Sequence, residues 1–262
     1  KNSLIYDTKI NRLLPPNGTV LEILPLKLPY ASQSGFYTVS VNAYDLSNKK
    51  IGGSTTSFEL PKSQITVSPN LQSAFVSGTN NIVLAMNNIG RIGVSSGILG
   101  LGLKDPEGIS IYTGSKPFSL GIGQTINLDF PLFISSLKFG EYMLTYTQSD
   151  ETKTGQPSTK TISNSATIAL SLDKASYKVR EAVNLTVDLT NTGRFNLENA
   201  SVIVSVPDAN YTDTKTVTIG QGEALFLQFV VPLPETMTVG QHDVNVALTL
   251  PSGSSIVQRT KL

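Results

Sequence analysis

Two similar stretches, 103 residues apart, decide the fold class of this chain. "TVSPNLQSAFVSGTNNIVLAMNNIGR" runs from Thr66 to Arg91, and "ALSLDKASYKVREAVNLTVDLTNTGR" runs from Ala169 to Arg194. They align without a gap, and both close on an Asn-x-Gly-Arg motif that places Asn88 on Asn191, Gly90 on Gly193 and Arg91 on Arg194. Self-similarity at a fixed spacing indicates that the chain is built from structural repeats.

Further signals extend the repeat beyond the aligned stretches. "IGQ" occurs at 122–124 and again at 219–221, which pairs Gly123 with Gly220. A glycine two residues before a ring side chain follows in each repeat, as Gly140 with Tyr142 and Gly240 with His242, and the N-terminal part has Gly35 with Tyr37. These signals predict two complete repeats, residues 63–165 and 166–262, preceded by the C-terminal half of a third in residues 1–62.

The residues between the turns alternate between apolar and polar. In "VNLTVDLTN" the apolar positions are Val183, Leu185, Val187 and Leu189, a period of two that is typical of half-buried strands. Such segments recur every 10–15 residues and are separated by turn clusters such as "DPEG" and "PSGSS". About seven strands in about 100 residues predict an all-β fold of tandem immunoglobulin-like antiparallel β-sandwiches. Because the connections between repeats are short, we expect an elongated rod.

The C-terminal repeat resembles a known family. The residues that carry the resemblance are "VDLTNTGRFNLENASVIVSV", "TVTIGQGEALFLQF" and "VGQHDVNVAL", and they are similar to CARDB-type (cell-adhesion-related) domains and related bacterial and archaeal extracellular Ig-like tandem repeats. The resemblance covers residues 166–262, more loosely 64–165, and the second half of a repeat in 1–60. It implies tandem modules of a secreted or cell-surface protein, without naming an activity.

Composition removes several classes of function. The net charge is +1, with no dense basic stripe, so nucleic acid and anionic lipid are not expected partners. The chain has no cysteine, which excludes disulfides, thiolate metal sites and cysteine nucleophiles. No apolar run is long enough to span a bilayer. The N-terminus carries no Met and no signal core, and we expect a mature or excised piece of a larger protein.

We expect no enzyme, no cofactor and no dedicated metal site. His242 is the only histidine, and Asp243 beside it on a strand would point to the opposite face, so the two cannot act as base and orienter. The acids nearest to a calcium-loop pattern lack its spacing; they are Asp105, Glu107, Asp150, Glu151, Asp208 and Asp213.

Other singled-out residues favour structural roles. In Ig-like sandwiches a tyrosine near the start of the sixth strand bonds back to the preceding corner, and Tyr37 and Tyr142 are candidates, with His242 as the replacement in the last repeat. An arginine bonding turn carbonyls is the preferred interpretation of Arg91 and Arg194, with a repeated ligand site as the alternative. Four N-x-Ser/Thr sequons occur, as often as chance predicts, at Asn17, Asn184, Asn199 and Asn210.

The glycine-rich stretch "NNIGRIGVSSGILGLGLK", residues 87–104, is not a phosphate-binding loop. Its spacing is G-x-x-G-x-G, and no helix follows it. The alignment instead predicts a strand with Leu99, Leu101 and Leu103 facing inward. Gly100 and Gly102 fall on the opposite, outer face, where close packing or a bulge is expected. If the protein assembles with itself or with a partner, Gly97, Gly100 and Gly102 are the first expected contact positions.

These observations favour a non-catalytic structural or adhesive segment that spaces or assembles neighbouring domains or subunits. A glycan- or protein-binding module is the first alternative, and it predicts exposed aromatics such as Tyr30, Phe36 and Tyr112 around one concavity. An accessory region of a secreted hydrolase, with its catalytic domain elsewhere, is the second. For the incomplete first repeat, we expect the missing strands to come from upstream chain or from another subunit.

Overall fold

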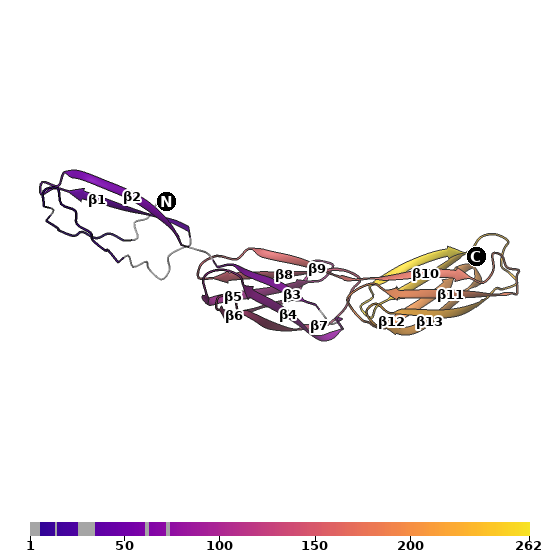
Figure 1. The fold of residues 1–262 in the computed structure, drawn as a ribbon. Coiled ribbons are helices and arrows are strands. Elements are labelled where there is room, and N and C mark those ends of the chain that lie inside the picture. Colours follow the sequence, from indigo (N-terminus) through magenta and orange to yellow (C-terminus); the bar gives the residue numbers. More distant parts are fainter. Residues whose placement is uncertain (1–5, 14, 26–34, 61–62, 72–73) are drawn as a thin grey trace.

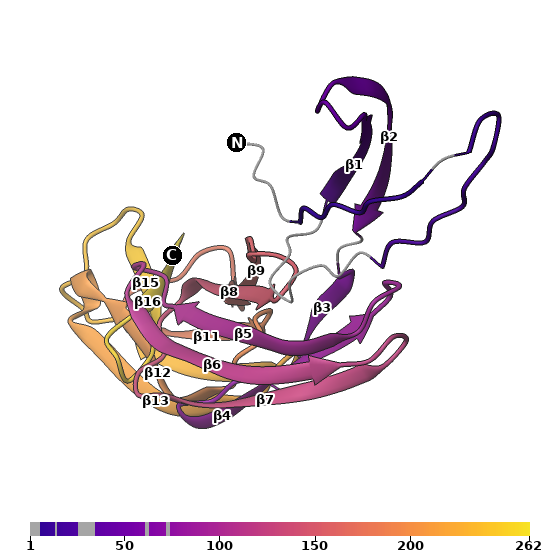
Figure 2. The same cartoon turned by 90° about the vertical axis from the view of Figure 1, so that its left-hand side faces the viewer.

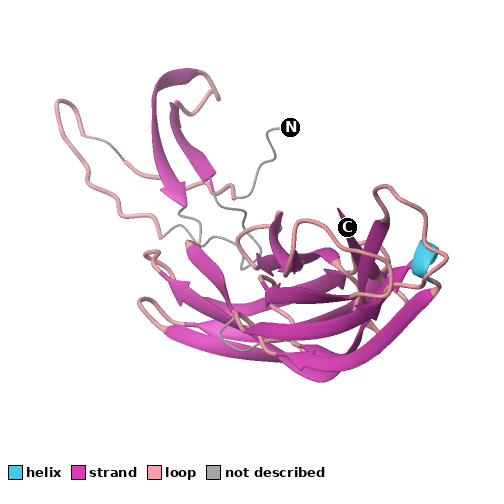
Figure 3. Cartoon of the chain, turned by 90° about the vertical axis from the view of Figure 1, so that its right-hand side faces the viewer, coloured by secondary structure: helices cyan, strands magenta, loops and turns pink. Residues whose placement is uncertain are grey.

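The computed structural model describes residues 6–13, 15–25, 35–60, 63–71 and 74–262. It is an all-β structure of antiparallel sheets, apart from one 3-10 turn at Pro207–Ala209, which Figure 3 shows in cyan. No helix in the described part of the chain has the length and apolarity that crossing a membrane requires.

Residues 63–165, here the central unit, form two sheets. One sheet has the strand order β3-β4-β7 and the other the order β6-β5-β8-β9. The strands are β3 (Ile65–Asn70), β4 (Gly78–Asn88), β5 (Val94–Lys104), β6 (Ser110–Leu120), β7 (Thr125–Ile134), β8 (Gly140–Asp150) and β9 (Pro157–Asn164).

Residues 166–262, here the C-terminal unit, repeat that arrangement strand for strand. Their sheets have the orders β10-β11-β14 and β13-β12-β15-β16. The strands are β10 (Ala166–Leu172), β11 (Ala182–Asn191), β12 (Leu197–Val206), β13 (Tyr211–Ile219), β14 (Ala224–Pro232), β15 (Asp243–Thr249) and β16 (Ser255–Lys261). Identical strand orders in both halves mean that the sequence repeat is a repeat of topology.

Alternating side chains fill the space between the two sheets of each unit. In the central unit Leu99, Leu101 and Leu103 of β5 are buried, which confirms the predicted inward row. The C-terminal unit buries Val202, Val204 and Val206 at the aligned positions of β12. Burial of such branched side chains is the main force that holds paired sheets together.

The expected bulge is also present, and it occurs in both units. Register shifts between Val94 and Gly97 in β5 and between Leu197 and Ala200 in β12, which are aligned positions. At Gly97 a Cβ atom would overlap with the ring of Phe118, its partner on β6. At Gly100 and Gly102, by contrast, a Cβ atom would make only an ordinary contact, 3.8 Å from the carbonyl oxygens of Thr147 and Tyr112.

One part of the sequence alignment is wrong by two residues. Gly123 is matched structurally by Gly222, not by Gly220, since both have φ near 70° and both donate their amide to the carbonyl of the repeated asparagine. Gly220 instead corresponds to Gly121, because each amide donates to a side-chain oxygen three positions on, in Gln124 and in Glu223. The shared letters "IGQ" are therefore a coincidence. Leu120 and Ile219, both buried, are the equivalent positions that set the true register.

The N-terminal part of the chain shows one sheet among its described residues. The hairpin β1 (Gly35–Tyr44) and β2 (Lys50–Leu60) pairs along its length, and Tyr37 stacks on Phe58 with ring centroids 5.7 Å apart. Residues 15–25 lie outside any sheet. Figures 1 and 2 show this part separate from the two sheet pairs, which lie end to end along the chain.

Candidate functional site

The most highly organised region lies where the central and C-terminal units meet. Its first component is the repeated asparagine, which the sequence marked only as part of a turn. Asn191 is fully buried; its Nδ2 donates to the carbonyls of Phe195 (2.7 Å) and Ile219 (3.1 Å), and its Oδ1 accepts from the Gly193 amide (3.1 Å). Asn88 makes the same three bonds in the central unit, to Ile92, Leu120 and Gly90. Each asparagine thus fixes the turn that follows it.

The glycine of this motif is required by a close approach of backbone. A Cβ atom at Gly193 would lie 2.5 Å from the amide nitrogen of Ser165, in the connection between the two units. A Cβ at Gly90 would lie 2.8 Å from the amide nitrogen of Gln64 in the same way. Because no side chain fits there, the connecting segment crosses directly over the turn, and the amide of Gly193 donates to the Ser165 carbonyl at 2.9 Å.

Beyond that glycine, the turn of the C-terminal unit reaches the central unit. The Phe75 amide donates to the Arg194 carbonyl (2.9 Å), and the Asn196 amide donates to the Phe75 carbonyl (2.8 Å). Arg194 also donates from Nη1 to the Leu71 carbonyl at 2.5 Å. The prediction that Arg194 bonds a carbonyl is confirmed, but the carbonyl belongs to the neighbouring unit. Arg91 makes no such bond among the described residues.

An aromatic cluster forms the apolar part of the joint. Phe195 is fully buried, and its ring lies 4.6 Å from that of Tyr142 and 5.1 Å from that of Phe75, centroid to centroid. Tilted ring pairs at such distances add to the free energy of burial. The central unit has the smaller, half-buried Ile92 at the position aligned with Phe195.

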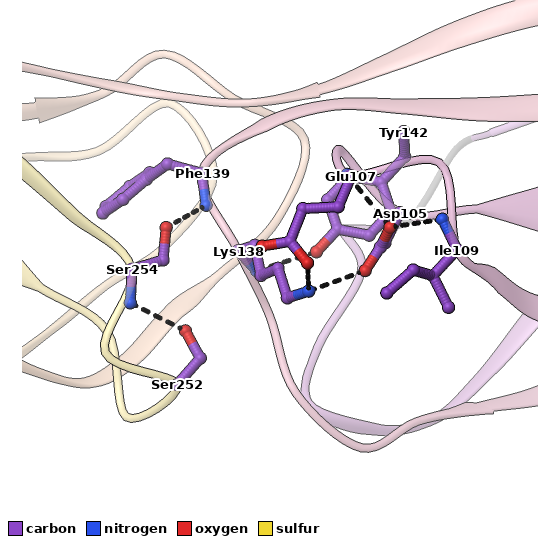
Figure 4. A network of polar contacts seen from close by, with 8 residues as sticks. All are labelled: Asp105, Glu107, Ile109, Lys138, Phe139, Tyr142, Ser252 and Ser254. Atoms are coloured by element: carbon purple, nitrogen blue, oxygen red, sulfur yellow. Dashed lines mark hydrogen bonds and ion pairs between the residues drawn. The ribbon is translucent and has the colours of Figure 1, made fainter.

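Tyr142 also holds the corner that faces the joint. Its hydroxyl accepts a hydrogen bond from the Lys138 amide at 2.8 Å, which confirms the predicted tyrosine corner. Lys138 is held at further points: its carbonyl accepts from Asn164, and its Nζ donates to Asp105 (2.8 Å) and Glu107 (2.6 Å). Figure 4 shows this network, with the neighbouring Phe139 amide donating to Ser254 Oγ of the C-terminal unit at 3.0 Å.

One lysine binds two carboxylates at this corner. The two carboxylates, Asp105 first, raise the pKa of Lys138 to about 12. Burial alone would raise the pKa of Asp105, but bonds from Lys138 and from the Ile109 amide hold it below its usual value. These acids therefore act as structural partners of a lysine, and no group of three or more acidic or histidine side chains among the described residues is placed to hold a metal ion.

A small hollow of about 120 Å³ remains beside the joint. It is lined by residues of both units: Ser77, Ser135, Ser136, Leu137, Glu198, Leu250, Pro251 and Ser252. Its size admits a few water molecules, well below the several hundred Å³ of a typical small-molecule site.

The far end of the C-terminal unit has different chemistry. His242 is buried; its Nε2 lies 2.8 Å from the Thr238 carbonyl and its Nδ1 lies 2.7 Å from Asp208 Oδ2. The expected corner role of His242 is confirmed, and Asp243 pairs separately with Lys261. The positions aligned with Leu71 and Phe75 are Lys174 and Lys178, and ion pairs join Lys174 to Glu181 and Arg180 to Glu235.

The remaining sequence candidates do not converge on a site. The acids in turns accept hydrogen bonds from nearby protein groups. Asp150 accepts from the side chains of Ser63 and Gln148. Glu151 accepts from the Ser95 and Ser96 amides, and Asp213 accepts from the Thr214 amide. The four sequon asparagines are all exposed: Asn17, Asn184, Asn199 and Asn210. Phe36 and Tyr112 lie in different sheets, and Tyr30 lies outside the described residues. Residue 33, four positions before Tyr37, is also outside the described residues, so the corner hydrogen bond of Tyr37 stays a prediction.

Comparison with known proteins gives no family. No protein-family model matches the chain, and no curated protein matches it. Solved structures with partial likeness include a transglutaminase of red sea bream (9% identity, TM-score 0.41, 78% of this chain and 31% of that one) and a tetra-tandem repeat from the extending region of a large adhesion protein (16% identity, TM-score 0.34, 88% and 56%). An exo-chitosanase of Amycolatopsis orientalis is a third (14% identity, TM-score 0.28, 69% and 25%). This chain thus spans between a quarter and just over half of the length of each.

Proposed function

We propose that residues 63–262 are a stiff, non-catalytic spacer segment of a cell-surface or secreted protein. In this proposal the two units are Ig-like sandwiches set end to end as a rod, and residues 1–62 are the C-terminal half of a further repeat. The strand orders, with three strands in one sheet and four in the other, and the corner at Tyr142 support the Ig-like assignment. The extracellular location rests on the resemblance to CARDB-type repeats.

The observation that carries the proposal is the joint. Two units linked by a flexible tether would leave the residues at their facing ends solvated and mobile. Here the buried ring of Phe195, a main-chain bridge at Phe75 and the hydrogen bond from Phe139 to Ser254 connect the two units. Several contacts made by separate segments restrict the relative motion of the units, which is the property a spacer needs.

Distances measured between the two units test this proposal. The chain has no cysteine, so spin labels can be placed at Thr113→Cys and Thr214→Cys, both exposed and one in each unit. We expect a narrow distance distribution in the parent chain and a broad one after Phe195→Ala or Arg194→Ala.

The chain supplies its own control for that experiment. Ile92→Ala and Arg91→Ala change the aligned positions of the central unit, which lie away from this joint, and are expected to leave the distribution narrow. A parent distribution as broad as that of Phe195→Ala would refute the stiff spacer.

A further inference from the structure

The two units differ in how their sheets meet along one side. In the C-terminal unit the edge strands β10 and β16 pack against each other and close the gap between the sheets. The equivalent edge strands of the central unit, β3 and β9, approach within 8 Å (Cα to Cα) at isolated points at most. A cleft of about 300 Å³ lies there instead.

The cleft has an apolar floor and a polar rim. Ile65 and Val67 of β3 and Tyr146 of β8 supply half-buried apolar surface. The rim is formed by Lys153, Thr154, Gly155, Gln156 and Ser158, and the buried Gln148 lies below it. Lys153 has no ion pair among the described residues.

Both walls of the cleft are free strand edges. Among the described residues β3 pairs in a sheet only with β4, and β9 pairs only with β8. Each strand therefore has a free edge on its other side, apart from the Ser163 carbonyl of β9, which accepts from the Arg194 amide. Neighbouring strands lie about 4.8 Å apart, so one strand inserted between two others needs about 10 Å. Two strand edges that make few close approaches and flank an open cleft are therefore suited to an added strand.

The same chain contains an extended segment that lacks a sheet partner. Residues 19–25, "TVLEILP", are in no strand, and the side chains of Leu21 and Ile23 are 88% and 83% exposed. They are two residues apart, the spacing at which side chains share one face of a strand and the same spacing as Ile65 and Val67. Glu22 between them is already paired with Arg12 of its own chain, at 2.7 and 2.8 Å, so the match to the cleft depends on the two apolar side chains.

We propose that residues 19–25 of one copy insert between β3 and β9 of a second copy. A second copy is the occupant because, within one chain, this segment lies beyond the N-terminal end of the central unit (Figure 1). The contact joins different surfaces of the two copies, so it extends from copy to copy and builds a linear assembly. This association goes beyond the spacer role and does not depend on the joint.

Disulfide trapping between two differently mutated chains tests the insertion. Ile23→Cys is introduced in one chain and Ser158→Cys, on the cleft rim, in the other, and the two are mixed under mild oxidation. The parent has no cysteine, so each chain carries a single thiol. We expect a covalent heterodimer, and we expect Leu21→Asp in the Ile23→Cys chain to reduce its yield several-fold.

The matched control uses the closed unit. Gln258 of β16 pairs in register with Val246, as Ser158 of β9 pairs with Tyr146. Gln258 is exposed, like Ser158. Equal trapping by Gln258→Cys, or no trapping by Ser158→Cys, overturns the proposal. A chain with both Ile23→Cys and Ser158→Cys that closes its disulfide within a monomer overturns it as well, because the occupant is then the chain's own segment. Phe195→Ala should leave the yield unchanged, which separates this result from a failure of the spacer.

Discussion

Tyr142 and His242 occupy the same corner of the two units, and each binds the backbone four residues before it with opposite hydrogen-bond polarity. The Tyr142 hydroxyl accepts from the Lys138 amide, whereas the His242 ring faces the Thr238 carbonyl. Because Asp208 also faces the ring, both nitrogens of His242 meet acceptors. Both contacts are hydrogen bonds only when the imidazole carries two protons.

The stability of the C-terminal unit should therefore fall as pH rises. Asp208 first, then the Thr238 carbonyl, raise the pKa of His242 above its ordinary value, while burial of the ring and the nearby Lys261 oppose them. The native state then binds the proton more tightly than the unfolded state, so the stabilisation is complete below about pH 6.5 and is lost as pH passes the higher native pKa. Thermal midpoints between pH 5 and 9 should show this decline.

A neutral replacement separates His242 from other titrating groups. His242→Gln should remove the decline between pH 6 and 9, since its amide carries no titrating charge. The ion pair between Asp243 and Lys261 is unchanged in that variant, so any pH dependence that it contributes is the same in both proteins. A parent midpoint that rises with pH across this range would contradict the assignment.

The repeated asparagines should be among the costliest polar side chains to remove. Asn191→Ala leaves the carbonyls of Phe195 and Ile219 without their buried side-chain donor, whereas the Gly193 amide keeps its bond to the Ser165 carbonyl. Each such orphaned group costs about 1–3 kcal/mol, so we expect a loss of at least about 2 kcal/mol in the free energy of unfolding. Asn87→Ala, beside Asn88 and facing outward, is the control, and chemical denaturation followed by circular dichroism is the measurement.

The bulge glycine and the outer-face glycines of β5 should respond in opposite directions. Gly97→Ala forces its new methyl group into the ring of Phe118 and should cost about 1–3 kcal/mol. Gly102→Ala adds only an ordinary contact, 3.8 Å from the Tyr112 carbonyl oxygen, and should be neutral or stabilise by about 0.5 kcal/mol, since alanine restricts the unfolded chain. Phe118→Leu should rescue Gly97→Ala, and failure of that rescue would locate the cost elsewhere.

Truncation at the joint should destabilise one unit far more than the aligned truncation in the other. Phe195 is fully buried between two rings, and Phe195→Ala should cost about 3–5 kcal/mol. Ile92→Ala removes a smaller and half-exposed side chain and should cost about 1 kcal/mol. Similar costs for the two variants would show that the aromatic cluster adds nothing beyond local burial.

Much of the architecture was predictable because it depends on local periodicity. Alternation with a period of two predicts which side chains of β5 and β12 face inward, and the aligned Gly-x-ring signal predicts the corner at Tyr142. Gly35, Gly140 and Gly240 all have positive φ, between 126° and 149°, which explains why this position is glycine in every repeat. Such features need only a few consecutive residues to specify them.

The joint was not predictable, because its parts are distant in sequence. Phe75, Tyr142 and Phe195 come from three separate segments, and only the fold brings their rings together. One sequence signal pointed to the joint: Phe195, a large aromatic residue directly after the turn, stands where the other repeat has Ile92. The role of the asparagines was hidden for the same reason, since the carbonyls of Leu120 and Ile219 lie 32 and 28 residues from their donors.

The two units differ at the end that lies farther along the chain. In the central unit this end forms the joint and carries Leu71 and Phe75. In the C-terminal unit the aligned positions are Lys174 and Lys178, near ion pairs. A permuted chain with the two units in reversed order would bring those lysines against Ile92 and would bury no aromatic ring. Units that share one topology are therefore not interchangeable in position, and the order in which they are encoded is itself a determinant of the assembled structure.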